Sequence, residues 1–333
     1  MGLTWSQIRS IYPPHPEFTE ANLPDLDGKV YIITGSTSGI GLALAHLLYS
    51  KHATLYLAAR STPKTLAAIS SLRSAHPTSR GTLTPLPLDL SDLSTIKPAA
   101  EAFLARASRL DVLFNNAGVA FAPPGSKSAQ GHEIHLAVNN LGPFLLTQLL
   151  APLLVATARR EPSNAVRVVW TSSIAAELDG YAPGGVPVAD LDGAYPRAGM
   201  GARELYGISK AGNYLHATEF ARRYGGERGE GGGVVSVALH PGTVCTELGR
   251  ELPMWVRRVV RVTVGYPAVM GAYSELFAGL SGEVGGSRWI IPWGRFGPLR
   301  QDLIDASKPE SEGGTGVAEK WWEWSERQVK PYM

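Results

Sequence analysis

The sequence has little cysteine and little charge. Cys245 is the one cysteine among 333 residues, so no disulfide can form within the chain. The cysteine and histidine residues also lack the spacing of a structural zinc site, and we expect no metal. Lysine and arginine total 31 against 29 acidic residues, a net charge of +2 without a long basic run. This balance excludes the basic surface of a nucleic-acid binder, and the scarcity of cysteine favours a reducing compartment.

Long uninterrupted apolar runs are missing as well. The first 30 residues contain several prolines and acidic residues, so they lack the apolar core of a signal peptide. The most apolar stretch, Leu136 to Thr157, contains Asn139, Asn140 and Pro152, which a lipid-facing span would leave unsatisfied. We interpret this stretch as a buried helix and expect a cytoplasmic protein. A hydrophobic content of 44% is enough for a full core.

Short runs rich in β-branched residues alternate with longer helical stretches from residue 28 to about 291. This alternation is typical of a doubly wound parallel sheet with helices on both faces. The expected strands are 29–34, 54–59, 83–88, 112–115, 166–172, 234–239 and 289–291. The expected helices are 40–50, 64–74, 92–108, 133–157 and 204–224. The sequence therefore predicts one seven-stranded α/β domain at 28–307, an N-terminal extension at 1–27, and a tail at 308–333 with a flexible link and a short docking helix.

A glycine-rich turn directly follows the first expected strand. It consists of Gly35, Ser36, Thr37, Ser38, Gly39, Ile40 and Gly41. Glycines here permit a tight turn, let backbone N–H groups approach a pyrophosphate, and let the next helix point its positive end at the anion. Because strand, turn and helix fall in register, we predict a Rossmann-type dinucleotide site rather than an ordinary turn.

The end of the second expected strand bears on which dinucleotide binds. An NAD site commonly offers a carboxylate there to the ribose 2′-hydroxyl, but this chain has Arg60. A guanidinium matches the geometry of a 2′-phosphate. The sequence therefore favours NADP(H) over NAD(H), the alternative being a solvated surface arginine.

The order of the motifs resembles the short-chain dehydrogenase/reductase family. The turn has the spacing Thr34-Gly35-x-x-x-Gly39-x-Gly41, and the later motifs follow in family order. These are Asp89-Leu90, Asn115-Asn116-Ala117-Gly118, Asn139-Asn140-Leu141-Gly142, Ser172-Ser173, Tyr206-Gly207-Ile208-Ser209-Lys210 and His240-Pro241-Gly242-Thr243-Val244. The residues Pro143-Phe144 and Thr246-Glu247-Leu248 are similar to retinol-dehydrogenase-like members and to fungal ketoreductases of secondary metabolism.

The resemblance implies roles for these residues. Asp89 would contact the adenine, and Thr243, Val244 and Thr246 would hold the nicotinamide carboxamide and the pyrophosphate. The cofactor-binding set, beyond the glycine turn, would be Arg60, Asp89, Leu90, Asn115, Asn116, Ala117, Gly118, Tyr206, Lys210, Pro241, Gly242, Thr243, Val244 and Thr246. The catalytic set would be Ser173, Tyr206, Lys210 and Asn139, with Asn139 relaying protons through a water near Lys210.

The spacing of Tyr206 and Lys210 suits acid–base chemistry. Residues four apart on a helix project from one face, and a nearby ammonium favours the phenolate and lowers the pKa of a tyrosine. Ser173 stands at the carboxyl end of an expected strand, where open α/β sheets place their ligands, and would hydrogen-bond a substrate oxygen. A packed ring beside a lysine, or a serine cap, is the structural alternative for each residue alone.

Three further segments carry predictions. The loop 179–201 is an insertion that we expect to border the substrate pocket. The segment 246–266 has arginines on one helical face and apolar residues on the other, which favours an apolar lid over the substrate, with a membrane-surface helix as the alternative. Cys245 is expected to be a small buried residue. The first residues, from Gly2, also fit a myristoylation pattern, which arises often by chance.

These observations predict an NADP(H)-dependent ketoreductase or alcohol dehydrogenase that acts on a hydrophobic ketone, aldehyde or secondary alcohol. Tyr206 would serve as the acid or base. An epimerase or dehydratase on the same fold and a non-catalytic dinucleotide sensor are the alternatives. The resemblance also implies a homodimer or homotetramer, and the apolar residues Leu145, Leu149 and Leu153 are compatible with such contacts.

Overall fold

The computed structural model describes residues 10–193, 195–226, 233–249, 254, 258 and 265–333. The myristoylation pattern at Gly2 and most of the expected lid at 246–266 lie outside these residues. Of that lid, the structure describes Thr246, the short 3₁₀ turn η4 (Glu247–Gly249), the exposed positions Met254 and Arg258, and residues 265–266.

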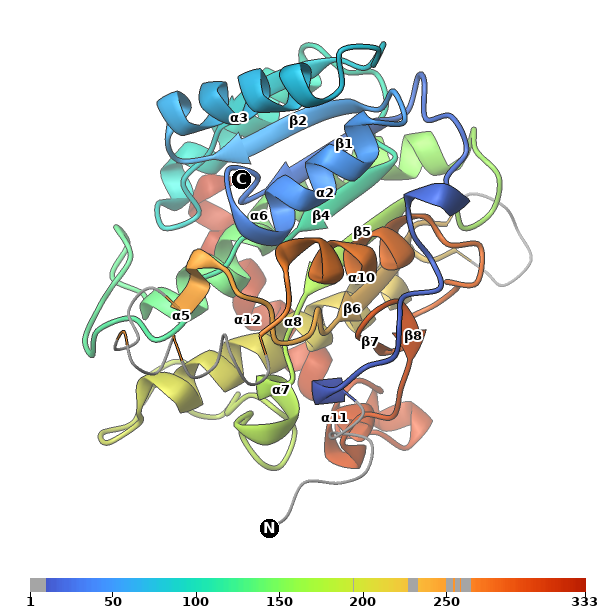
Figure 1. The fold of residues 1–333 in the computed structure, drawn as a ribbon. Coiled ribbons are helices and arrows are strands. Elements are labelled where there is room, and N and C mark those ends of the chain that lie inside the picture. The colour runs from blue at the N-terminus through green and yellow to red at the C-terminus, as the bar shows by residue number, and fades with distance from the viewer. Residues whose placement is uncertain (1–9, 194, 227–232, 250–253, 255–257, 259–264) are drawn as a thin grey trace.

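A single sheet forms the centre of the molecule (Figure 1), and its strand order is β3-β2-β1-β4-β5-β6-β7-β8. The strands are β1 (Val30–Thr34), β2 (Thr54–Ala59), β3 (Leu83–Pro87), β4 (Val112–Asn115), β5 (Arg167–Thr171), β6 (Val235–Leu239), β7 (Ile290–Ile291) and β8 (Arg295–Phe296). All neighbouring pairs are parallel except β7 and β8. The predicted Rossmann-type doubly wound fold is therefore confirmed.

The sheet has eight strands where the sequence predicts seven. The additional strand, β8, has two residues and pairs antiparallel with β7, Ile291 opposite Arg295. Gly294, with a φ of +82°, makes the reversal between them. Two residues are too few to show a strand periodicity, so β8 had no signal in the sequence.

Helices cover both faces of the sheet. One face carries α2 (Gly39–Tyr49), α3 (Thr62–Ala75) and α10 (Ala268–Leu280), of which α2 and α10 pack side by side (Figure 1). The other carries α4 (Ile96–Leu104), α6 (Gly142–Ala158) and α8 (Ala202–Tyr224). Short helices α5 (Ile134–Leu136), α7 (Ala175–Leu178) and α11 (Gln301–Ala306) lie in the connections. The five predicted helices are present within a few residues, whereas α7, α10 and α11 were not predicted.

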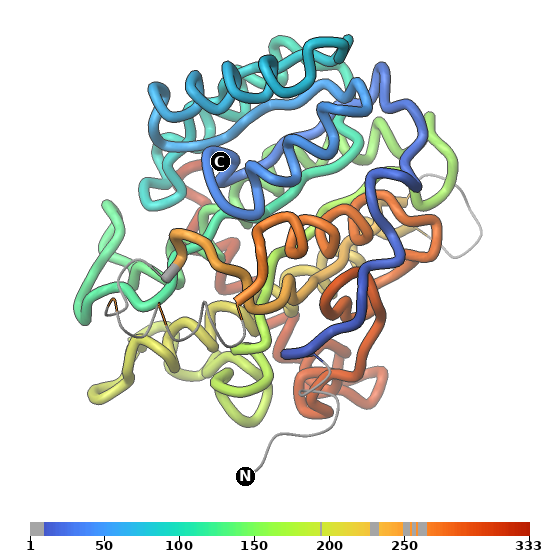
Figure 2. The backbone as a smooth tube through the Cα atoms, in the orientation of Figure 1, coloured from blue at the N-terminus to red at the C-terminus, as the bar shows by residue number. Residues whose placement is uncertain are grey.

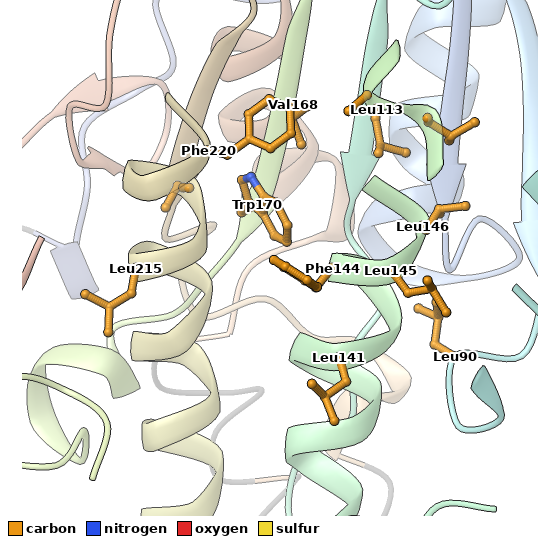
Figure 3. Packing of buried hydrophobic residues seen from close by; sticks show 14 of the residues in the cluster. Leu90, Leu113, Leu141, Phe144, Leu145, Leu146, Val168, Trp170, Leu215 and Phe220 are labelled. Atoms are coloured by element: carbon orange, nitrogen blue, oxygen red, sulfur yellow. The ribbon is translucent and has the colours of Figure 1, made fainter. Parts of the chain in front are cut away.

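The strands alternate their side chains between two apolar layers. In β5, Val168 and Trp170 enter the layer under α6 and α8, while Val169 enters the layer under α2 and α10. Figure 3 shows Trp170 facing Phe144 of α6 across the first layer. The two layers make a parallel sheet that is buried on both faces, which fixes the carboxyl ends of its strands as one rigid edge.

The most apolar helical segment is buried in this core. Ile134–Ala158, made of α5, the π-helical turn η3 (Ala137–Leu141) and α6, is long and apolar enough to cross a membrane, and 67% of its most apolar window is buried. It is the one such helix among the described residues. Its packing matches the prediction of a core helix.

The tail folds back onto the domain. Its last helix, α12 (Val317–Val329), packs on α8 and buries Trp321, Trp322 and Trp324. The preceding link, predicted to be flexible, is folded into turns: Thr315 N–H donates to the Asp305 carbonyl at 2.9 Å. Near the other end of the chain, the tube in Figure 2 runs past α10, where the Phe18 ring meets the Phe277 ring edge-on at 5.8 Å.

The insertion at 179–201 packs differently from the prediction. Val186 and Leu191 are buried in the main core, and Gly185 approaches Leu303 of α11 and Ala211 of α8 closely. None of its described residues lines the cleft found below. The loop therefore packs between α8 and α11, and its buried apolar residues fix it to the core.

Candidate active site

One large cleft, of about 500 Å³, opens at the carboxyl edge of the sheet. It lies at the carboxyl ends of β1 and β4. The strand order reverses between these two strands, since β2 and β3 follow on one side of β1 and β5 to β8 follow on the far side of β4. Open α/β sheets bind their ligands at this switch point. The predicted residues that line the cleft are Gly35, Thr37, Ser38, Gly39, Ile40, Arg60, Asp89, Leu90, Asn116, Ala117, Gly118, Ser173, Tyr206, Lys210, Pro241, Gly242, Val244 and Thr246.

The glycine turn is shaped as a cradle for an anion. Gly35 and Gly39 have φ of +67° and +56°, a conformation that side-chain-bearing residues rarely adopt. A Cβ on Gly35 would lie 3.0 Å from the Ala117 Cα, and one on Gly39 would lie 3.0 Å from Thr246. Within the described chain, the N-cap residue Ser38 makes no side-chain bond to α2, so the first N–H groups of that helix stay open to a pyrophosphate. The turn therefore fits the diphosphate of a dinucleotide.

At one end of the cleft, Arg60 follows β2 and is exposed. Lys64, in the first turn of α3, lines the same end, as does Ser61, whose hydroxyl accepts the Lys64 N–H at 3.4 Å. Lys64 was not among the predicted residues, although a second cation four residues after Arg60 is visible in the sequence. The two cations suit a 2′-phosphate, and Asp89 lies on the same stretch of the cleft.

Tyr206 is the buried acid–base candidate on the cleft wall. Its side chain is 7% exposed, and burial raises its pKa to about 12, with a side-chain hydrogen bond to Ser173 acting in the opposite direction. The Lys210 ammonium lies 5.6 Å from the centre of the Tyr206 ring. Burial, rather than the Lys210 ammonium, is therefore the largest influence on the pKa of Tyr206 in this structure.

Lys210 is anchored to the end of β5. Its Nζ donates to the Thr171 carbonyl at 2.8 Å, and its own carbonyl accepts the Ser172 hydroxyl at 2.6 Å. Burial lowers its pKa to about 8, against the attraction of the Glu275 carboxylate, which raises it. Ser172 therefore fixes the helix that carries Lys210, and Ser173 is the serine beside Tyr206.

Asn139 lies behind the cleft rather than on its surface. Its Oδ1 accepts the Val119 N–H at 2.8 Å, and its Nδ2 donates to the Val119 carbonyl and the Ser209 hydroxyl. A Cβ on Gly118 would lie 3.1 Å from Asn139 Oδ1 and 3.2 Å from Lys210 Nζ, so only glycine lets the three groups approach. Asn139 thus holds the cleft segment in place, and its relay role stays a prediction.

Some predicted residues do not line the cleft. Ser36 is buried with its hydroxyl toward the Ala58 carbonyl, and Gly41 packs under the turn. Asn115 turns into the core, where its Nδ2 donates to Thr147 at 2.9 Å. Thr243 is likewise absent from the described lining. For Asn115, the last residue of β4, the neighbour Asn116 takes the cleft position, because adjacent residues of an extended segment point to opposite sides.

Cys245 is exposed, so the expectation of a buried cysteine is wrong. The reason is the same alternation: Val244 pairs with Tyr266 in an isolated parallel bridge and faces the cleft. The next residue must then point away from it.

The end of the cleft next to Tyr206 is apolar. Phe121, which has a φ of +55°, places its ring 5.9 Å from the Tyr206 ring, with Ala120 and Ala175 in the same cluster. The apolar lining residues at this end are Val119, Ala120, Ala122, Pro123, Ile134, Val138 and Leu248, of which only Leu248 lies in a segment predicted from the sequence to cover the substrate. Loops contribute most of them, and loops carry no periodicity to read. No cluster of metal-binding side chains occurs in the part of the chain that the structure describes.

Fold and cleft together define a class of protein: a Rossmann-type dinucleotide binder whose cleft carries a serine, a tyrosine and a lysine. Comparison with known proteins agrees. A family model described as short chain dehydrogenase matches residues 29–184. A short-chain dehydrogenase/reductase of Phomopsis amygdali is 48% identical over 99% of this chain and 97% of its own length. The short-chain dehydrogenase/reductase pkfC of Emericella nidulans is 47% identical over 96% of this chain and 98% of its own.

Solved structures show the same fold. A protein from Mycobacterium paratuberculosis with no assigned function is 28% identical, with a TM-score of 0.67 over 94% of this chain and 97% of its own. A gluconate 5-dehydrogenase from Beutenbergia cavernae, which holds NADP, is 22% identical, with a TM-score of 0.60 over 81% of this chain and 97% of its own. The NADH-dependent reductase A1-R′, which holds NAD, is also 22% identical, with a TM-score of 0.59 over 82% of this chain and 99% of its own. This chain belongs to the short-chain dehydrogenase/reductase family, whose members are oxidoreductases that bind a nicotinamide dinucleotide.

Proposed function

We propose that the protein is an NADPH-dependent reductase of hydrophobic ketones or aldehydes. The observation that carries this proposal is the position of Tyr206, which is buried beside Ser173 on the wall of one cleft that has the glycine turn at one end and an apolar lining at the other. A neutral phenol suits the reductive direction, in which the enzyme gives a proton to the substrate oxygen. The cations Arg60 and Lys64 support a preference for NADPH.

Each residue has a defined part in this reaction. The nicotinamide, when bound, supplies the hydride. Tyr206 donates its proton to the carbonyl oxygen, and the Ser173 hydroxyl holds that oxygen by a hydrogen bond. Lys210 supplies positive charge 5.6 Å from the phenol ring, which stabilises the phenolate left by proton transfer. Val138, Ile134 and Leu248 exclude water and hold the apolar part of the substrate.

The test is the variant Tyr206→Phe, with Tyr214→Phe as the matched control. Tyr214 is a buried tyrosine of the same helix that lies outside the cleft lining, and its hydroxyl is 3.4 Å from Ser307. We expect Y206F to lose about 10²–10⁴-fold in the rate of NADPH oxidation with a panel of hydrophobic ketones, while it still binds NADPH. The control should keep its activity. Full activity in Y206F would refute the mechanism.

The same assay separates the alternatives. An epimerase or dehydratase would turn over substrate without net oxidation of NADPH. A sensor would bind NADPH and convert nothing, but such a protein needs neither the phenol nor the ammonium that this cleft holds.

The remaining proposals concern partners and place in the cell. We propose a small hydrophobic substrate as partner, no nucleic acid and no membrane contact, and a cytoplasmic location. Self-association as a homodimer or homotetramer through α6 and α8 also stays a proposal. Of the apolar residues expected at such a contact, Leu145 is fully buried, whereas Leu149 and Leu153 are partly exposed. Light scattering on the purified protein decides it.

A further inference from the structure

We propose that Glu275, a buried glutamate of α10, is a positioning residue that acts on Lys210 through Thr171. The inference rests on the proposed function, in which Lys210 must carry its charge beside Tyr206. No motif of the sequence analysis includes Glu275, and it does not line the cleft.

Thr171 connects the two residues across the sheet. As the last residue of β5, it directs its hydroxyl to the face covered by α10, where it donates to Glu275 Oε1 at 2.5 Å. Its carbonyl accepts Lys210 Nζ at 2.8 Å and Asn213 Nδ2 at 3.0 Å, both from α8 on the opposite face. One residue therefore holds the catalytic lysine on one side and the carboxylate on the other.

Glu275 is unusual for a structural residue. Its exposure is 0%, and its second oxygen, Oε2, has no hydrogen-bond partner among the described residues. A buried carboxylate with an orphaned oxygen costs free energy that a leucine would not. The geometry therefore points to a role for the charge itself rather than for packing.

The charge that Glu275 affects is that of Lys210. Burial opposes the charged form of both groups, and each favours the charged form of the other. On the lysine side the neighbouring titratable group is Tyr206. Among the described residues, the other titratable group on α10 itself is Tyr273, which contacts Glu20. The elements packed against α10 add His46 and Tyr49 from α2 and Arg167 from β5. Of these, Arg167 is occupied by the carbonyls of Ala278 and Ser281 at the far end of α10.

The consequence is a lysine that stays protonated through the working range. Without the carboxylate, burial would act on Lys210 unopposed, and its ammonium would lose the proton at lower pH. Removing a buried opposite charge that favours the ammonium shifts such a titration by about one pH unit. The reductase activity would then fall off at correspondingly lower pH.

The experiment compares pH profiles of kcat from pH 5.5 to 10 for the wild type, Glu275→Gln, Glu275→Asp and the control Ser274→Ala. Ser274 neighbours Glu275 on α10 and is equally buried, and its hydroxyl has no partner among the described residues. We expect the alkaline limb of E275Q to move down by about one pH unit, E275D to move less because it keeps the charge, and S274A to match the wild type. An unshifted limb in E275Q, whatever its thermal stability, would overturn the proposal.

A second readout does not depend on turnover. The titration of Lys210 can be followed by ¹³C NMR of lysine-labelled protein, with its signal assigned by the variant Lys210→Arg. The same downward shift in E275Q supports the proposal even if no substrate has been found, and an identical titration in E275Q and wild type contradicts it. Failure of the proposed function would show separately, as a wild type that oxidises no NADPH.

Discussion

Replacing Gly41 by alanine should damage cofactor binding although Gly41 does not line the cleft. A Cβ at this position would lie 2.6 Å from Asn116 Nδ2 and 2.6 Å from the Gly35 carbonyl oxygen, closer than such atoms approach in proteins. Asn116 donates to the Thr34 carbonyl at 2.8 Å and so ties the turn to the end of β4. The methyl group therefore has to displace either this amide or the backbone of the turn.

The size of the effect follows from the overlap. Overpacking of this kind costs about 1–3 kcal/mol, and the turn can relieve it only by leaving the shape that fits a pyrophosphate. If that cost falls on the cofactor-binding conformation, the Kd for NADPH rises by about 5- to 150-fold.

Isothermal titration calorimetry with NADPH measures this, and Gly193→Ala is the control, because a Cβ there meets nothing within 4 Å. The control should bind NADPH as the wild type does. A G41A protein with unchanged affinity would show that the turn tolerates a side chain and would refute the account of the cradle.

Three other predictions are open to measurement. Arg60→Ala should weaken NADPH binding about 10-fold and leave NADH binding unchanged, since the guanidinium is exposed and makes a charge-assisted contact only to a 2′-phosphate. Equal losses of affinity for NADPH and NADH would contradict this role of Arg60. Trp321→Ala should lower the free energy of unfolding by about 3–5 kcal/mol, measured by circular dichroism in urea, because the ring is fully buried, whereas the exposed Leu66→Ala should change it by less than about 0.5. Burial lowers the pKa of His216 to about 3, so the unfolded chain binds an additional proton below pH 6.5 and stability falls as the pH drops from there towards 3. His216→Gln should reduce this slope by about 1.4 kcal/mol per pH unit, and an unchanged slope between pH 6 and 4 would count against a neutral His216.

The elements with strong local patterns were predictable from the sequence. The longer strands, the glycine turn and the helix carrying Tyr206 and Lys210 each have a periodicity or a spacing that refers only to nearby residues. The features that could not be predicted depend on which way a side chain points or on contacts between residues far apart in the chain. Whether Asn115 or Asn116 faces the cleft depends on one step of strand alternation.

Residues far apart in the chain set the environment of the site. The pKa of Tyr206 depends on how deeply other segments bury it, and the sequence shows only that Lys210 is four residues away. Glu275 has no neighbouring motif, and the helix that carries it was not predicted. Its position under Thr171 becomes visible only when α10 is placed against β5.

The packing of α12 has a consequence for how the protein is made. Trp321 donates its ring N–H to the Gly212 carbonyl at 3.1 Å, two residues along α8 from Lys210, although the two residues are 109 positions apart in the chain. The outer side of the helix that carries Tyr206 and Lys210 is therefore covered only after α12 has been synthesised and has docked on α8. A premature stop codon upstream of α12 would leave that side bare.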